Sequence, residues 1–263
     1  MISKWIITGD CHQQFSRFRN LDGDETTGVI ILGDVGLNYN LNESDRAAKK
    51  GLCKQYPFVF YCVRGNHEAR PGEHLGMKMV HDEDVGGTVW IEEEFPRIRY
   101  FCDWGCYKIK GMNVLVIGGA YSVDKPIRIA NGWKWFENEQ LAQFEMDACM
   151  RGARDIDFDL ILSHTCPLSL QPTDLFLSWI NQSTVDNSME IWMEELSEKI
   201  NWNIWLFAHY HTDRVEWPHV EIFYQEMEPL QDILARWARY DENGELDWWI
   251  PVGPKFQKLV EKS

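Results

Sequence analysis

The sequence predicts an α/β protein in which helices pack outside a β-sheet, and three observations support this. Six short apolar runs, rich in β-branched or aromatic residues, are too short for helices and are typical of strands. Three longer segments carry the apolar spacing or the capping residues of helices. Strands and helices alternate along the chain, as they do in α/β folds. A chain of 263 residues can bury a sizeable core, so we expect a single domain over residues 1–263.

The elements can be placed in chain order. Strands are predicted at residues 5–8, 29–32, 58–63, 113–119, 160–163 and 204–208, and helices at 42–56, 137–152 and 186–200. Asn42 and Asp186 open two of these helices and are residue types that cap helix N-termini. Residues 118–135 are expected to form a loop. Residues 214–250 change to short aromatic strands with a turn at 241–244, so we expect hairpins that close the sheet, with 214–263 added to the same domain.

Composition narrows the classes of function. The chain is 44% hydrophobic and 25% charged, which is typical of a globular protein. Its 13 tryptophans are mostly assigned to packing, with base or substrate stacking as the alternative. The net charge of −15 repels polyanions, so long nucleic acid is disfavoured as a partner unless a basic groove or bound metal reverses the field.

Targeting and cysteine signals point to the cytoplasm. The first strand begins too early for a signal peptide, and no apolar run is long enough to span a membrane. The seven cysteines are odd in number and scattered, so they do not form a disulfide framework. We therefore expect a protein of the reducing cytoplasm with no membrane partner.

Polar residues follow five of the predicted strands, in the segments GDCH, GDVG, RGNHE, HTCP and HYH. Each segment alone fits a helix cap, an Asx turn or a core histidine. Their coincidence indicates a site, because ligands of open α/β sheets bind beyond the carboxyl ends of the strands. The candidate ligands are Asp10, His12, Asp34, Asn66, His164, His209 and His211.

These residue types suit a metal centre. In extended chain, Asp10 and His12 point the same way, as do His209 and His211, so each pair can direct two ligands into one pocket. Carboxylate and amide oxygens mixed with imidazoles suit Mn, Fe, Zn, Co or Ni. Seven candidates exceed the needs of one ion, and two divalent ions that share a carboxylate account for the surplus.

The ordered motifs Asp-x-His, Gly-Asp, Gly-Asn-His-Glu, a later His and a final His-x-His resemble those of the calcineurin-like metallophosphoesterase superfamily. The resemblance spans residues 10–211 and implies two facing β-sheets flanked by helices, an αββα sandwich. It implies that Asp10, His12 and His211 hold one metal, that Asn66, His164 and His209 hold the other, and that Asp34 bridges them. It also implies that His67 is catalytic, whereas Gly65 lets the chain turn off its strand.

The implied function is a dinuclear metal-dependent hydrolase that cleaves a phosphomonoester or phosphodiester. A hydroxide bridging the metals would attack phosphorus, and His67, if protonated, would donate a proton to the leaving oxygen or neutralise its charge. Manganese is our first choice of metal. Glu68 is expected either to orient a histidine or to be an ordinary exposed glutamate.

Departures from the superfamily pattern bear on the substrate. Ala208 replaces the usual glycine before the final His-x-His, and GDVGLNYN lacks the Asp-Arg-Gly continuation of protein phosphatases. We therefore expect a small phosphate ester. Lys125 and Arg128 in the 118–135 loop are candidate phosphate-binding cations, with a solvated surface loop as the alternative.

Rival interpretations remain at this point. Cys11 and Arg17 match the Cys-x5-Arg of cysteine-dependent phosphatases, but the intervening loop has no glycine to cradle phosphate. A protein phosphatase or a nuclease of the same superfamily is an alternative, as is a non-catalytic scaffold that keeps its metals. The sequence does not choose between monoester and diester, fix the native metals or set the oligomeric state.

Overall fold

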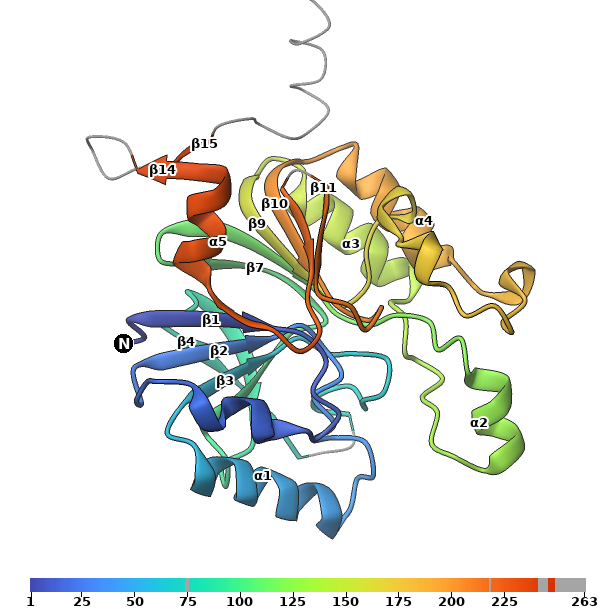
Figure 1. Cartoon of the computed structure of the whole chain (residues 1–263), viewed down its shortest axis with the longest axis horizontal. Coiled ribbons are helices and arrows are strands. Elements are labelled where there is room, and N and C mark those ends of the chain that lie inside the picture. Colours follow the sequence, from blue (N-terminus) through green and yellow to red (C-terminus); the bar gives the residue numbers. More distant parts are fainter. Residues whose placement is uncertain (74–75, 218, 241–245, 249–263) are drawn as a thin grey trace, which may run out of the picture.

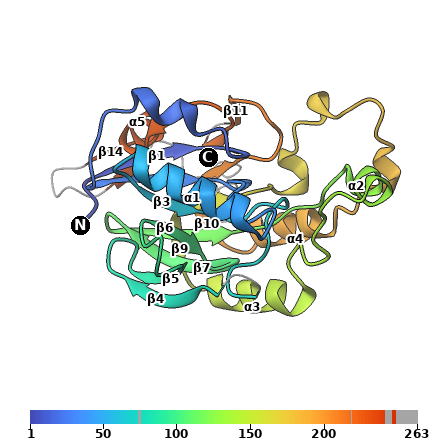
Figure 2. The ribbon, with the colours of Figure 1, turned by 90° about the horizontal axis from the view of Figure 1, so that it is seen from below.

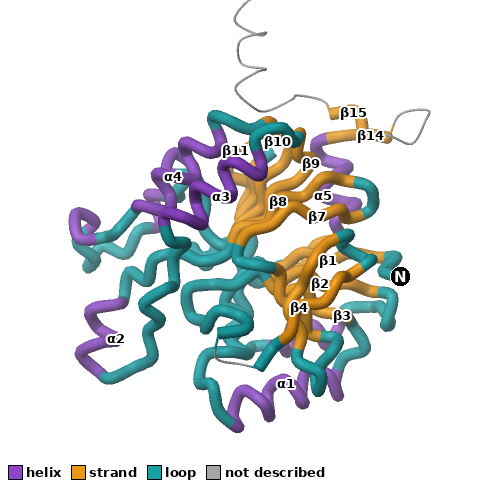
Figure 3. The backbone as a smooth tube through the Cα atoms, turned by 180° about the vertical axis from the view of Figure 1, so that it is seen from behind, coloured by secondary structure: helices purple, strands orange, loops and turns teal. Residues whose placement is uncertain are grey.

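Two β-sheets pack face to face in the computed structural model, which describes residues 1–73, 76–217, 219–240 and 246–248 (Figure 1). Helix α1 (Glu43–Gln55) covers the outer face of one sheet, and helices α3 (Gln143–Ala153) and α4 (Ser188–Ser197) cover the outer face of the other. From below, α1 lies across the strands of the first sheet (Figure 2). From behind, the strands form two layers (Figure 3). This is the αββα sandwich that the sequence motifs imply.

The first sheet has seven strands in the order β13-β1-β2-β3-β6-β5-β4. Their bounds are β1 Lys4–Thr8, β2 Thr27–Ile31, β3 Val59–Cys62, β4 Lys78–Asp82, β5 Gly87–Ile91, β6 Ile98–Phe101 and β13 Met227–Pro229. Strands β1, β2, β3 and β6 run parallel, and the remaining three pair antiparallel with their neighbours. The carboxyl ends of β1, β2 and β3 therefore lie at one edge.

The second sheet has six strands in the order β11-β12-β10-β9-β8-β7. Their bounds are β7 Trp104–Ile109, β8 Met112–Ile117, β9 Asp157–Ser163, β10 Asn201–Phe207, β11 Arg214–Trp217 and β12 Val220–Ile222. The inner strands β8, β9, β10 and β12 run parallel, so the carboxyl ends of β9 and β10 also share an edge.

Successive side chains of a strand point to opposite faces of its sheet, so the buried apolar residues form three layers: one between the sheets and one on the outer face of each sheet. In β1, Trp5 and Ile7 pack between the sheets, whereas Ile6 packs toward the α1 side. In β10, the alternate residues Ile204 and Leu206 lie between the sheets, and their neighbours pack toward α3 and α4. Strands with apolar side chains on both faces are buried on both faces, which explains why they read as continuous apolar runs.

The six predicted strands correspond to β1, β2, β3, β8, β9 and β10, and the three predicted helices to α1, α3 and α4. The start predicted for α3 at residue 137 is wrong, because the helix begins at Gln143. Among the residues before the helix, Glu139 is buried and accepts hydrogen bonds from the backbone and side chain of Ser122.

The expected loop at 118–135 contains a helix, α2 (Lys125–Asn131), which Gly132 ends in a left-handed conformation. The expected hairpins at 214–250 are correct for β11 and β12, but α5 (Leu230–Trp237) is a helix. Its Leu230, Ile233 and Leu234 pack into the core between the sheets. A small ribbon of β14 (Ala238–Tyr240) and β15 (Leu246–Trp248) follows. The predicted turn at 241–244 and the tail at 249–263 lie outside the described residues.

Among the described residues, no helix has the length and apolar character required to cross a bilayer. All seven cysteines are described, and each is a free thiol.

Candidate metal centre

Seven candidate ligands gather where strands of both sheets end. Asp10, Asp34 and Asn66 follow β1, β2 and β3 of the first sheet, and His164 and His209 follow β9 and β10 of the second. Backbone hydrogen bonds join the first two turns, since the amides of Cys11 and His12 both donate to the carbonyl oxygen of Asp34 at 3.1 and 2.8 Å. Because its ligands come from both sheets, the centre lies at the boundary between them.

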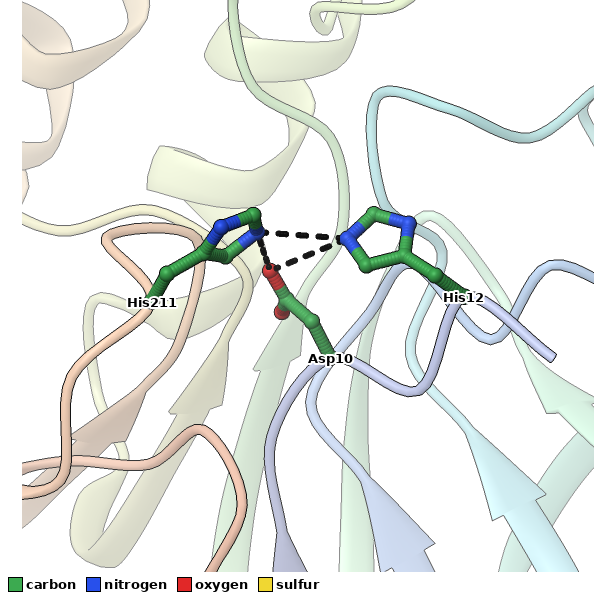
Figure 4. Close-up of side chains that lie close together, drawn as sticks. All are labelled: Asp10, His12 and His211. Carbon is green, nitrogen blue, oxygen red and sulfur yellow. Dashed lines mark hydrogen bonds and ion pairs between the residues drawn. The ribbon is translucent and has the colours of Figure 1, made fainter. Parts of the chain in front are cut away.

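Asp10, His12 and His211 form one cluster (Figure 4). Asp10 Oδ2 lies 3.0 Å from His211 Nε2 and 3.8 Å from His12 Nε2, and the two imidazole nitrogens are 3.2 Å apart. Among the described residues, no side chain or backbone group meets the buried Oδ2 atom of Asp10 in hydrogen-bond geometry. Burial raises the pKa of the Asp10 carboxyl, but the nearby His211 and His164 outweigh burial and lower that pKa below its ordinary value. An ionised carboxylate facing two imidazoles fits a divalent cation.

A second group of ligand atoms surrounds His164. Its Nδ1 lies 2.8 Å from the carbonyl oxygen of Leu32, which can only accept, so Nδ1 carries a proton. Its Nε2 faces Asn66 Oδ1 at 2.9 Å and Asp34 Oδ2 at 3.7 Å. An imidazole nitrogen, an amide oxygen and a carboxylate oxygen that converge on one point are ligand types of divalent metals, so this arrangement also fits a metal ion.

The Asn66 amide is held in place by two residues that the motifs do not contain. Asn66 Nδ2 donates to Ser122 Oγ at 2.8 Å, and that hydroxyl donates to Glu139 Oε2 at 2.5 Å. These two hydrogen bonds fix the orientation of the Asn66 amide, so that its oxygen faces His164. Ser122 and Glu139 were missed because their only signal in the sequence is polarity within a predicted loop and a predicted helix.

His209 packs its ring 4.9 Å from the ring of His164, and its backbone N–H donates to Asp10 Oδ1 at 3.2 Å. Burial and then the neighbouring His164 lower the pKa of His209 to about 3. The ring is therefore neutral at physiological pH, which is the form that binds metals.

The backbone at the centre is strained. His12, Asp34, His209 and His211 have φ values of 44°, 44°, 68° and 52°, in the left-handed region that residues other than glycine seldom occupy. The extended i, i+2 geometry predicted for the Asp-x-His and His-x-His pairs is therefore wrong, although both pairs do reach the centre. Backbone strain of this kind concentrates at functional sites.

Glycines next to the ligands are required for space. A Cβ on Gly65 would lie 2.0 Å from Asp34 Oδ1, and one on Gly33 would lie 2.0 Å from His164 Nδ1. Gly33 also has a φ of 110°, whereas Gly65 is not among the residues of positive φ. Glycine is therefore required at position 65 because it leaves room for the Asp34 carboxylate, and not because of a positive φ.

Glu68 is buried, and within the part of the chain that the structure describes it forms no hydrogen bond with a histidine. Its Oε1 accepts hydrogen bonds from the Gly36 amide and the Tyr100 hydroxyl, both at 3.0 Å. Burial and then the charge of Asp34 raise the pKa of Glu68 to about 7. Both expectations for Glu68 are corrected, since it is neither exposed nor bonded to an imidazole; it stabilises the turn that follows Asp34.

His67 and Arg128 face each other beside Asp34. His67 Nδ1 lies 3.5 Å from Asp34 Oδ2, and His67 Nε2 lies 2.9 Å from Arg128 Nη2. Arg128 is also held by Asp124 Oδ1 at 2.7 Å and by the Tyr39 hydroxyl at 3.1 Å. Both predicted cations lie on α2 and not in a loop. Lys125 packs its ammonium 4.0 Å from the Trp135 ring, and no contact of Lys125 with a candidate ligand is seen.

Cys11 is buried, and burial raises the pKa of its thiol to about 12. Arg17 donates to the carbonyl oxygen of Asp10 at 2.8 Å instead of lining a phosphate loop. A thiolate nucleophile is therefore excluded, and Arg17 stabilises the main chain at the first ligand.

A cavity of about 350 Å³ opens from the centre. Asp34, Asn66, His67, His209 and His211 contribute to its lining, and Glu190 of α4 lies at its side. Glu190 is 3% exposed and accepts a hydrogen bond from Thr165 Oγ1 at 2.8 Å. Burial raises the pKa of Glu190 to about 7, and the Thr165 bond offsets this in part.

Replacing Glu190 with Gln is expected to stabilise the protein relative to wild type, and to do so much more at pH 8 than at pH 5. The ordinary pKa of 4.5 is raised in the fold to about 7, so the unfolded chain ionises first as pH rises. Stability conferred by the neutral carboxyl is present below about pH 4.5 and is lost as pH rises to about 7. Glu190→Gln should therefore gain about 3 kcal/mol in free energy of unfolding at pH 8 and little at pH 5. Urea unfolding at both values, with the exposed Glu195→Gln as matched control, measures this; equal effects of the two variants would contradict it.

Two solved structures align with this chain over nearly its whole length. A phosphopantetheinyl hydrolase from Mycobacterium tuberculosis aligns with a TM-score of 0.44 and 14% identity, covering 95% of this chain and 96% of its own. A 5'-nucleotidase precursor from Thermus thermophilus aligns with a TM-score of 0.38 and 13% identity, covering 98% of this chain and 57% of its own. No curated protein sequence matches.

The family model of calcineurin-like phosphoesterases matches residues 4–213. The chain belongs to the calcineurin-like phosphoesterase family. This family generally binds two divalent metal ions, and the candidate clusters of this chain fall inside the matched region. Membership supports a phosphoester hydrolase.

Proposed function

We propose that this protein hydrolyses a small phosphate ester at a centre of two divalent cations. The observation that carries the proposal is the convergence of metal-ligand atoms: His164 Nε2 faces Asn66 Oδ1 and Asp34 Oδ2 beside the Asp10 cluster. Imidazole nitrogens gathered with carboxylate and amide oxygens suit divalent cations. When bound, two divalent cations supply an activated water and positive charge against the phosphoryl oxygens.

The proposed ligand sets are those that the sequence motifs imply. Asp10, His12 and His211 would hold one cation, and Asn66, His164 and His209 the other. Asp34 would serve both, since its Oδ2 lies 3.7 Å from His164 Nε2 and 3.9 Å from His12 Nε2. Mixed oxygen and imidazole donors suit Mn, Fe, Zn, Co or Ni, with Mn as our first choice.

Arg128 would bind the phosphoryl group, and His67 would donate a proton to the leaving oxygen. A guanidinium can only donate, so Arg128 Nη2 at 2.9 Å leaves His67 Nε2 as an acceptor and places the ring proton on Nδ1, toward Asp34. A phosphoryl group that engages Arg128 would release Nε2 from this bond. His67 can then carry a proton at Nε2 and donate it to the leaving oxygen.

Charge and shape favour a small ester over a polymer. A net charge of −15 opposes nucleic acid, which disfavours a nuclease. The cavity of about 350 Å³ fits a small molecule. Protein phosphatase activity and a metal-binding scaffold are the remaining alternatives, and activity measurements separate them.

Chelator-stripped protein is expected to lose hydrolysis of p-nitrophenyl phosphate and bis-p-nitrophenyl phosphate and to regain it with Mn²⁺. The ratio of the two rates assigns monoesterase or diesterase chemistry. Protein that binds two metal ions per chain yet hydrolyses neither these esters nor phosphopeptides would contradict the proposal and favour a scaffold.

A further inference from the structure

The cavity above the centre has an unusual wall. Its floor is polar, but one side is built from segment 171–185, which lies between the 3-10 turn at Leu168–Leu170 and α4. This segment projects from the same end of the molecule as α2 (Figures 1 and 2). It lines the cavity with Leu175, Phe176, Leu177, Trp179, Ile180 and Val185.

Three of these large apolar side chains face solvent. Leu175, Leu177 and Trp179 are 39%, 46% and 60% exposed. Apolar side chains gathered at the mouth of a cavity indicate a binding surface, because exposure of a contiguous apolar patch is unfavourable. Phe176 stacks on the Tyr210 ring at 6.4 Å, so the wall is anchored between His209 and His211.

The charged groups that line the cavity, apart from its histidines, are acidic. Among the described residues that line it are the carboxylates of Asp34, Asp124 and Glu190, but no Lys or Arg. Asp124 is paired with Arg128 at 2.7 Å. A second anionic group on the substrate, away from the centre, would therefore find no Lys or Arg among these lining residues to pair with it.

We propose that the wall formed by segment 171–185 binds the leaving group of the ester, and that this group is uncharged and apolar. The proposal rests on the proposed function, which places the phosphoryl group at the floor. In the reaction a water oxygen bonds to phosphorus, the ester P–O bond breaks, and the apolar alcohol leaves with one proton. The volume of about 350 Å³ is at the small end for ligand sites, which matches an alkyl or aryl group of moderate size.

A series of ethyl, butyl and hexyl phosphate tests this, because their leaving alcohols differ in apolar surface and hardly in chemical reactivity. The kcat/KM of hexyl phosphate is expected to exceed that of ethyl phosphate by roughly tenfold or more. Glycerol phosphate and a nucleoside diphosphate should be poor substrates. Titration calorimetry with ethylphosphonate and hexylphosphonate, which are not hydrolysed, measures the same preference as binding.

Two variants locate the preference. Trp179→Ser is expected to lower the hexyl-to-ethyl ratio several-fold. Trp133→Ser is the matched control, since Trp133 is 57% exposed but does not line the cavity, and its ratio should equal that of the wild type.

The outcomes separate this inference from the proposed function. If the protein hydrolyses p-nitrophenyl phosphate but shows equal kcat/KM for ethyl, butyl and hexyl phosphate, or prefers the nucleoside diphosphate, the apolar assignment alone is overturned. Tighter binding of hexylphosphonate without hydrolysis of any ester would support the wall and overturn the activity. A flat phosphonate series together with no hydrolysis would overturn both.

Discussion

Asp34→Asn is expected to lower kcat for p-nitrophenyl phosphate by about a thousandfold. Asp34 Oδ2 lies within 3.9 Å of His12, His67 and His164, so the substitution removes the negative charge shared by both proposed ligand groups. Asparagine keeps an oxygen that can accept the backbone N–H of His67, now at 2.8 Å, and it tolerates the φ of 44°. The variant should therefore fold.

Steady-state kinetics and metal analysis per chain measure this effect, with thermal unfolding to verify the fold. Asp22→Asn, at an exposed position of the segment between β1 and β2, is the matched control and should behave as wild type. An Asp34→Asn protein with full activity and full metal content would show that the shared carboxylate is not needed.

His67→Asn is expected to reduce kcat for an alkyl phosphate by about a hundredfold, with metal content unchanged. The loss should be much smaller for p-nitrophenyl phosphate, because its phenolate leaves without a proton. The difference follows from the position of His67, which lies beside Asp34 and faces Arg128.

The matched control is His81→Asn, since His81 is exposed on β4 and pairs only with Glu83 among the contacts seen. Equal losses for both esters would place His67 in phosphoryl binding instead of proton donation. Loss of metal would place it among the ligands.

Much of the fold could be predicted because the inner strands are buried on both faces. Strand β4 was not predicted, since most of its residues are exposed and it lacks an apolar pattern. Helix α2 is short and buries only Arg128, so it has no apolar periodicity from which it could be predicted. Helix α5 did carry a signal, the spacing of Leu230, Ile233 and Leu234, which the aromatic residues around it obscured.

The candidate site was predictable to the extent that strand ends mark it. All seven candidate ligands reach one region, but their left-handed backbone could not be foreseen from extended spacing. Ser122, which bonds Asn66, and Glu139, which bonds Ser122, lie 56 and 73 residues after Asn66, and only the tertiary structure brings them together. The apolar wall could not be predicted, because the sequence of segment 171–185 does not differ from that of an ordinary connection between a strand and a helix.

The centre draws its ligands from both sheets, and this has a thermodynamic consequence. Asp10, Asp34 and Asn66 belong to one layer, whereas His164, His209 and His211 belong to the other. Cations bound between them would act as a clamp across the sandwich, because separating the layers would require their release. Each tenfold rise in free metal above its dissociation constant would then add about 1.4 kcal/mol per bound ion to the free energy of unfolding. The metal supply of the cell would set both how fast this protein works and how long it stays folded.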